Sequence, residues 1–138
     1  MKSITQEIYI FRLHPGQDLK EQLITIAKNN NIHAGYIITC TGSLKEANLR
    51  LANSKESKKW LQKMEIVSLV GTVSIGGCHL HIALSDVLGN TIGGHLLDGC
   101  KIYTTAEVVI GNAIGLEFKR EQDHTTGYLE LDIKQKND

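Results

Sequence analysis

Hydrophobic and polar residues alternate near the start of the chain, which is the pattern of a β-strand with two distinct faces. Within residues 7–13, Ile8 and Ile10 fall on one side of the strand, and Tyr9 and Phe11 fall on the other. A His-Pro-Gly segment follows and interrupts regular structure. We therefore predict a strand that ends where this segment begins.

The hydrophobic period changes directly after this break. Leu19, Leu23, Ile26 and Ala27 recur at the spacing of one helical face. Asp18 is a residue type that caps helix N-termini, and a run of three asparagines is expected to end the helix. This is the one segment of the chain whose pattern clearly predicts a helix.

The rest of the chain is dominated by short runs rich in β-branched residues. After the first strand, the segments interpreted as strands are 34–44, 46–53, 64–74, 78–86, 91–97, 101–111 and 127–133. The first two of these are separated at Gly42 and Ser43, and the polar, basic segment 54–63 is interpreted as a surface loop. Because most connections are short, neighbouring strands should pair antiparallel.

These elements predict an α+β fold. We expect an antiparallel-dominated mixed sheet of about eight strands with one main α-helix. The 138 residues have the usual length of one domain, and a hydrophobic content of 41% is sufficient for a core. We therefore expect a single domain over residues 1–138, with its core at about residues 8–133.

Charge and cysteine content narrow the class of protein. The formal net charge is zero, which argues against a chain that holds nucleic acid mainly by charge. No apolar run approaches the roughly 20 residues of a membrane span, and the first residues lack the pattern of a secretory signal. Cys40, Cys78 and Cys100 contain no Cys-x-x-Cys pair and suit buried thiols in a reducing compartment. We expect a cytoplasmic protein that does not associate with membranes.

Three of the six histidines lie close together in the sequence. His79 and His81 are two residues apart in one predicted strand and therefore share a face. The turn at residues 88–90 should fold the next strand back, and that strand carries His95. The two glycines before His95 remove side chains and permit close approach of another chain segment. If His95 points the same way as the other two, three imidazoles converge.

Two interpretations of this cluster follow from the residues alone. Three neutral imidazoles with an open fourth position form a zinc site that accepts a ligand or substrate. Alternatively, the imidazoles form a hydrogen-bonded polar cluster, because an unpaired buried ring nitrogen costs roughly 1–3 kcal/mol. The sequence leaves both interpretations open, and imidazole ligands suit several divalent metals.

Charged residues in or beside apolar strands are the remaining candidates. Asp86 is the acid nearest the histidines and is expected to cap the turn that follows its strand. Arg12 and Glu107 each interrupt an apolar strand, and such charges face an edge, an interface or a partner. We consider Arg12 and Glu107 as catalytic or pocket-lining candidates, or as parts of a subunit contact. The alternative is that both face solvent.

Several segments occur in the order that characterises a known family. They are FRLHPGQDLKEQL, TCTGSLKEANLR, MEIVSLVGTVS, HLHIALSDVLGNTIGGHL and IYTTAEVVI. On these segments the chain closely resembles the plant and prokaryote conserved (PPC) domain over about residues 8–133, and residues 79–96 are the most specific part. The resemblance implies a compact α+β fold, similar to that of acetolactate decarboxylase, and assembly as a homotrimer.

The resemblance also bears on the site. Acetolactate decarboxylase holds zinc through three histidines, and the His-x-His plus Gly-Gly-His arrangement of prokaryotic PPC proteins looks like a similar site. By this resemblance His79, His81 and His95 would be the ligands of zinc or another divalent metal. Plant members carry an Arg-Gly-Arg-Pro AT-hook that enters the DNA minor groove, and this sequence contains none. Their partner-binding stretch corresponds to residues 62–67, where only Glu65 and Ile66 match.

Three functions are compared on this basis. The first is a stand-alone, trimeric binding or regulatory module with a three-histidine metal site and a small-molecule or protein partner. The alternative is a zinc-dependent enzyme acting on a small oxo-acid or carboxylate, with Arg12 and Glu107 as candidates for anchoring and proton transfer. Bacterial members of the family are described as candidate DNA-binding proteins, but the neutral charge and the missing AT-hook disfavour this third function. Whether the chain is an enzyme is left open.

Overall fold

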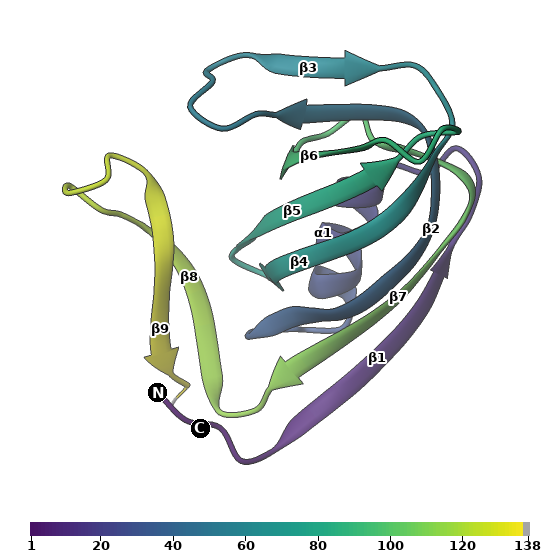
Figure 1. Cartoon of the computed structure of the whole chain (residues 1–138). Helices are drawn as coiled ribbons and strands as arrows, with labels where there is room; N and C mark the ends of the chain where they lie inside the picture. Colours follow the sequence, from purple (N-terminus) through teal and green to yellow (C-terminus); the bar gives the residue numbers. More distant parts are fainter. Residues whose placement is uncertain (137–138) are drawn as a thin grey trace.

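The structure, a computed structural model, describes residues 1–136 of the chain. Within those residues it contains one α-helix and nine strands (Figure 1). In chain order they are β1 (Gln6–Leu13), α1 (Leu19–Asn29), β2 (Gly35–Arg50), β3 (Ser57–Trp60), β4 (Met64–Ser74), β5 (Gly77–Ser85), β6 (Thr91–Leu96), β7 (Lys101–Ala113), β8 (Leu116–Gln122) and β9 (Leu129–Gln135). No helix in the described part of the chain has the length and apolar character needed to cross a membrane.

The main sheet has seven strands, in the order β1-β7-β2-β4-β5-β6, with β3 added beside β2. Strand β2 is long enough to pair with β4 through residues 35–44 and with β6 at residues 49–50. Strands β2, β4, β5 and β6 therefore close into a ring. Strands β8 and β9 form a separate hairpin, which Figure 1 shows standing apart from the main sheet. All strand pairings in residues 1–136 are antiparallel, which confirms the expected fold class.

Helix α1 supplies one side of the hydrophobic core. Its buried residues are the four predicted from the helical period: Leu19, Leu23, Ile26 and Ala27. The helix packs against β4 and β7, on the sheet face that carries the buried residues of those strands. Burial of this apolar stripe provides most of the stability of a helix of this length in water.

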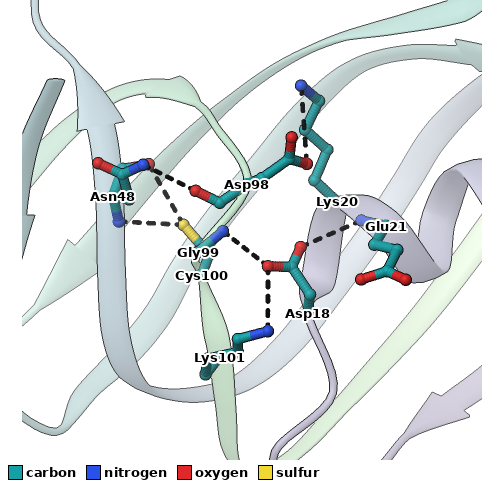
Figure 2. Close-up of polar contacts among 8 residues, drawn as sticks. All are labelled: Asp18, Lys20, Glu21, Asn48, Asp98, Gly99, Cys100 and Lys101. Carbon is teal, nitrogen blue, oxygen red and sulfur yellow. Dashed lines mark hydrogen bonds and ion pairs between the residues drawn. The ribbon is translucent and has the colours of Figure 1, made fainter. Parts of the chain in front are cut away.

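The start of α1 is fixed by a buried carboxylate (Figure 2). One oxygen of Asp18 accepts a hydrogen bond from the Glu21 backbone N–H at 3.1 Å, which confirms the predicted N-cap. The other oxygen accepts from the Gly99 N–H at 2.6 Å and lies 3.6 Å from the Lys101 ammonium. Asp18 therefore ties the helix to the turn that leads into β7.

Cys40 and Cys100 are buried thiols, as expected from the sequence, whereas Cys78 was also expected to be buried and is only partly so. Burial raises the pKa of Cys40 to about 12 and that of Cys100 to about 11. The Cys100 sulfur also lies 3.3 Å from the Asn48 backbone nitrogen (Figure 2). Because the thiolate is the reactive form, neither group is a nucleophile at neutral pH.

The predicted break at Gly42 was wrong, since the single strand β2 contains residues 35–44 and 46–50 of the two predicted strands. Glycine is needed at position 42 for close approach and not for a turn. A Cβ atom there would lie 2.0 Å from the Thr105 carbonyl oxygen on β7. The pairing of β2 with β7 shifts register on either side of Leu44. The strand therefore continues through bulges where the glycine and serine had suggested a turn.

Two other strands were not predicted. The segment interpreted as a surface loop contains β3, whose residues 57–60 pair with the end of β2. Strand β8 was overlooked because residues 116–122 carry charged residues at most positions, and its pairing with β9 forms a hairpin away from the main core. Short strands with few fully buried residues leave little hydrophobic alternation in the sequence.

Candidate metal centre

The three predicted histidines converge on one face of the sheet. His79 and His81 are exposed on β5, whereas Leu80 and Ile82 on the same strand are buried in the core. Strand β6 pairs with β5 in a register that places His95 directly opposite His81. One ring nitrogen from each histidine lies within 4.8 Å of the other two. His95 therefore points the same way as His79 and His81, and the three imidazoles converge as the sequence allowed.

Glycines allow His95 to lie this close to its neighbours. A Cβ atom on Gly93 would lie 2.9 Å from the Ile82 carbonyl oxygen of β5, and one on Gly94 would lie 2.8 Å from the Arg50 carbonyl oxygen of β2. Strand β6 is thus held tightly between two strands, as the two glycines indicated. Because residues opposite each other share a face, the pairing of Arg50 with His95 also directs that arginine toward the cluster.

The electrostatic environment keeps two of the imidazoles neutral. Burial, followed by the charge of Arg50, lowers the pKa of His95 to about 4. Burial, followed by the neighbouring His81, also lowers the pKa of His79. Neutral imidazole is the form that binds a metal ion, so these residues are ready to coordinate at neutral pH.

The donor set fits a divalent transition metal. The Nε2 atoms of His79 and His81 are 3.1 Å apart, and the buried Nδ1 atom of His95 has no hydrogen-bond partner among the described residues. Buried polar atoms are seldom left unpaired. Imidazole nitrogens suit zinc and its neighbours in the periodic table, and two close nitrogens beside a third imidazole with an unpaired nitrogen are consistent with a coordination site.

A cavity of about 710 Å³ adjoins the cluster. Its main-sheet side includes His79 and His95, and the β8–β9 hairpin forms the opposite wall. Arg120 of β8 reaches back to the main sheet, where its Nη2 atom donates a 2.6 Å hydrogen bond to the Thr72 hydroxyl. Thr72 is the residue opposite His79 in the β4–β5 pair, so Arg120 is fixed beside the cluster.

The family follows from a comparison with known domains. The family model described as the Plants and Prokaryotes Conserved (PCC) domain matches residues 3–114. The chain belongs to this family. The match covers the helix, the whole main sheet and all three histidines, which confirms the resemblance found in the sequence.

Solved structures share the PCC fold over nearly the whole chain. A hypothetical protein from Salmonella enterica is 39% identical, with 99% of each chain covered and a TM-score of 0.96. A protein from Archaeoglobus fulgidus, described as metal-containing, is 26% identical, with 94% of this chain and 96% of that chain covered and a TM-score of 0.83. A candidate DNA-binding protein from Bacteroides thetaiotaomicron, at 23% identity, 95% and 98% coverage and a TM-score of 0.79, shows the fold alone.

Curated relatives of this chain are much longer proteins, and they match it over only part of their length. The bifunctional protein GlmU from Synechococcus sp. (strain JA-3-3Ab) is 44% identical over 127 residues, which are 92% of this chain. The same match covers 20% of that protein, so the chain spans about a fifth of the length of its curated relative.

The other predicted residues lie elsewhere in the PCC fold. Arg12 and Glu107 are opposite each other in the β1–β7 pair, both exposed, and neither lines the cavity beside the histidines. The catalytic role suggested for Arg12 and Glu107 stays a prediction, and neither residue belongs to the histidine cluster. Asp86 accepts 2.9 Å hydrogen bonds from the backbone N–H groups of Leu88 and Asn90, so it caps the turn as expected.

Sequence reasoning missed the arginines that do lie beside the cluster, Arg50 and Arg120. Arg50 lies within the predicted strand 46–53 and is the last residue of β2. What the sequence did not contain was the pairing of that strand end with β6. Arg120 lies on the strand that was overlooked.

Proposed function

We propose that this PCC-domain protein binds zinc or another divalent metal ion through His79, His81 and His95. The observation that carries the proposal is the placement of three ring nitrogens within 4.8 Å of one another on adjacent strands. The unpartnered Nδ1 of His95 and the description of the Archaeoglobus relative as metal-containing support it. With three protein ligands, a zinc ion keeps a position for a water or a ligand and acts there as a Lewis acid.

The protein's own groups hold and orient this centre. Leu80 and Ile82 alternate with the histidines and anchor β5 in the core, so the imidazoles of His79 and His81 project from a rigid strand. Strand β6 is fixed by pairing on both edges, which limits the movement of His95. Ligands placed on paired strands lose little conformational freedom when a metal binds.

Metal content tests this proposal directly. Protein purified without a histidine tag should contain close to one metal ion per chain by elemental mass spectrometry. The His79→Ala, His81→Ala double variant should lose it, because one remaining imidazole cannot hold a divalent ion. His14→Ala is the matched control: it removes an exposed histidine outside the cluster and should retain the metal. Wild-type protein that takes up no zinc at neutral pH would contradict the proposal.

We further propose that the protein assembles as a homotrimer through exposed apolar residues of the sheet face that carries the histidines, outside the lining of the cavity. The strand registers join Ile8, Gly111, Tyr36, Thr72 and His79 into one row across this face. Large apolar side chains are exposed in the single chain on the same side. They include Ile8, Ile10 and Val70, with Ile10 being 75% exposed. Apolar surface of this extent favours association with another chain, and the family resemblance implies three copies.

Light scattering should give a mass near three times the 15.3 kDa of one chain. Replacing Ile10 with glutamate should reduce that mass, because a charge would be buried in the interface. Val87→Glu is the control, since Val87 is 94% exposed in the turn after β5 and should leave the assembly intact. A monomeric wild-type protein at micromolar concentration would rule out the trimer.

The cavity favours a second candidate function. A purely structural metal site is closed by protein ligands, whereas a catalytic site keeps access to solvent or substrate. The cavity of about 710 Å³ reaches His79 and His95 and contains one carboxylate, that of Glu130. A zinc-dependent enzyme acting on a small oxo-acid or carboxylate would use this space, with Glu130 in place of Glu107 as the group that could accept a proton.

A further inference from the structure

We infer that the cavity beside the histidine cluster binds a small organic anion, held by the guanidinium groups of Arg50 and Arg120. The inference deepens the proposed function, because a metal at the histidines would be a further contact for the same anion. The two arginines do not depend on that metal, so the metal site and the anion site can be tested separately.

The charge of the cavity lining is unbalanced. Its charged side chains are Arg50, Arg120 and Glu130, so two cationic groups face one carboxylate. Within residues 1–136 neither arginine takes part in an ion pair with an acid. A divalent ion at the proposed metal site would add two further positive charges. An anion is the ligand that compensates such a site.

Each arginine comes from a different strand, and both line the cavity together with His79 and His95. Arg50 lies opposite His95 across the β2–β6 pair. Arg120 donates through Nη2 to the Thr72 hydroxyl, and Thr72 lies opposite His79. This contact uses one of the five N–H donors of the Arg120 guanidinium and leaves others for a ligand. Partial burial lowers the pKa of Arg120, so its charge is incompletely hydrated and gains more from an anionic partner.

The remaining lining favours an organic ligand over a bare inorganic ion. Tyr128 and Leu129 project from the hairpin and are 63% and 59% exposed, and Cys78 contributes a half-buried apolar surface. The volume of about 710 Å³ is within the range of roughly 300–1,000 Å³ found for small-molecule sites. Guanidinium groups bind carboxylates and phosphates through paired hydrogen bonds, so both kinds of anionic group belong to the predicted class.

Calorimetric titration of the full chain tests the inference, in the metal-loaded and the chelator-treated form. The probes are 2-oxoglutarate and citrate as carboxylates, glucose 1-phosphate as a phosphate ester, and inorganic phosphate and sulfate as simple ions. At least one organic anion should bind the wild type more tightly than either simple ion. Arg120→Gln and Arg50→Gln should each weaken binding about tenfold or more, the effect of losing a charge-assisted hydrogen-bond pair.

Two further variants separate the specific contact from total charge. Lys119→Gln removes the same charge from the neighbouring position of β8, outside the cavity, and should leave the affinity unchanged. Arg120→Lys keeps the charge but not the paired donors and should give an intermediate affinity. Thermal unfolding of each variant without ligand checks that the fold is intact.

The outcomes distinguish this inference from the metal proposal. Arginine-dependent binding in the chelator-treated protein supports the anion site, even if no metal is found. Binding that requires the metal but is equal in Arg120→Gln, Arg50→Gln and the wild type overturns the anion site and leaves the metal centre intact. Failure of every organic probe to bind either form also overturns it, as does an equal loss of affinity in Lys119→Gln.

Discussion

Gly71→Ala is expected to destabilise the protein by about 3 kcal/mol or more and to remove most of its bound metal. Gly71 on β4 has φ +129°, a conformation that residues with a side chain rarely adopt. In addition, a Cβ atom there would lie 2.0 Å from the carbonyl oxygen of His79. The backbone that must move is therefore that of a proposed metal ligand, so stability and metal content should fall together.

Gly89→Ala is the matched control for this prediction. Gly89 has φ +81° in the turn after β5, but nothing lies within 4 Å of a Cβ atom added there. Only the conformational cost remains, about 1–2 kcal/mol, and the metal should be retained. Urea unfolding and metal analysis of both variants provide the comparison. Equal losses in the two variants would show that β4 does not restrain His79.

Replacing Asp18 with alanine should destabilise the protein by about 2–4 kcal/mol. The substitution removes the N-cap of α1 and leaves the partly buried Gly99 N–H without its 2.6 Å acceptor. Lys101 loses the carboxylate 3.6 Å away (Figure 2). The proposed metal ligands lie on β5 and β6, away from Asp18, so metal content per folded chain should not change.

Two substitutions test this explanation of the Asp18 effect. Asp18→Asn keeps an oxygen that can accept from a backbone N–H and should recover part of the lost stability. Asp98→Ala removes an exposed carboxylate, 3.9 Å from Lys20, and should cost at most about 1 kcal/mol, as surface ion pairs do. Thermal or urea unfolding measures all three. An Asp98→Ala loss as large as that of Asp18→Ala would contradict a special role for the buried cap.

The helix and most strands could be predicted because their patterns are local. The apolar residues of α1 recur at one period and follow a capping residue, and the alternation in β1, β4 and β5 survives in the burial of their side chains. The continuity of β2 could not be predicted. A glycine followed by serine suggests a turn, and only the approach of Thr105 from β7 explains why Gly42 lies within a strand.

The candidate site also has one part that the sequence predicts and another part that depends on strand pairing. That His79 and His81 share a face follows from strand geometry alone. Whether His95 joins them depends on the register of β6, because a shift of one residue would turn it to the opposite face. The cavity was beyond prediction, since Arg50 and Arg120 reach it only through the β2–β6 pair and the placement of the hairpin.

The separation of the β8–β9 hairpin from the main sheet bears on how such proteins diversify. The hairpin lies outside the residues matched by the family model, 3–114, yet it contributes Arg120, Tyr128, Leu129 and Glu130 to the cavity. Its exposed side chains add little to the core, so substitutions there carry a small folding penalty. Substitutions in the hairpin can therefore change the lining of the cavity without changing the three histidines. Among related chains, we expect differences in ligand preference to follow differences in the hairpin sequence.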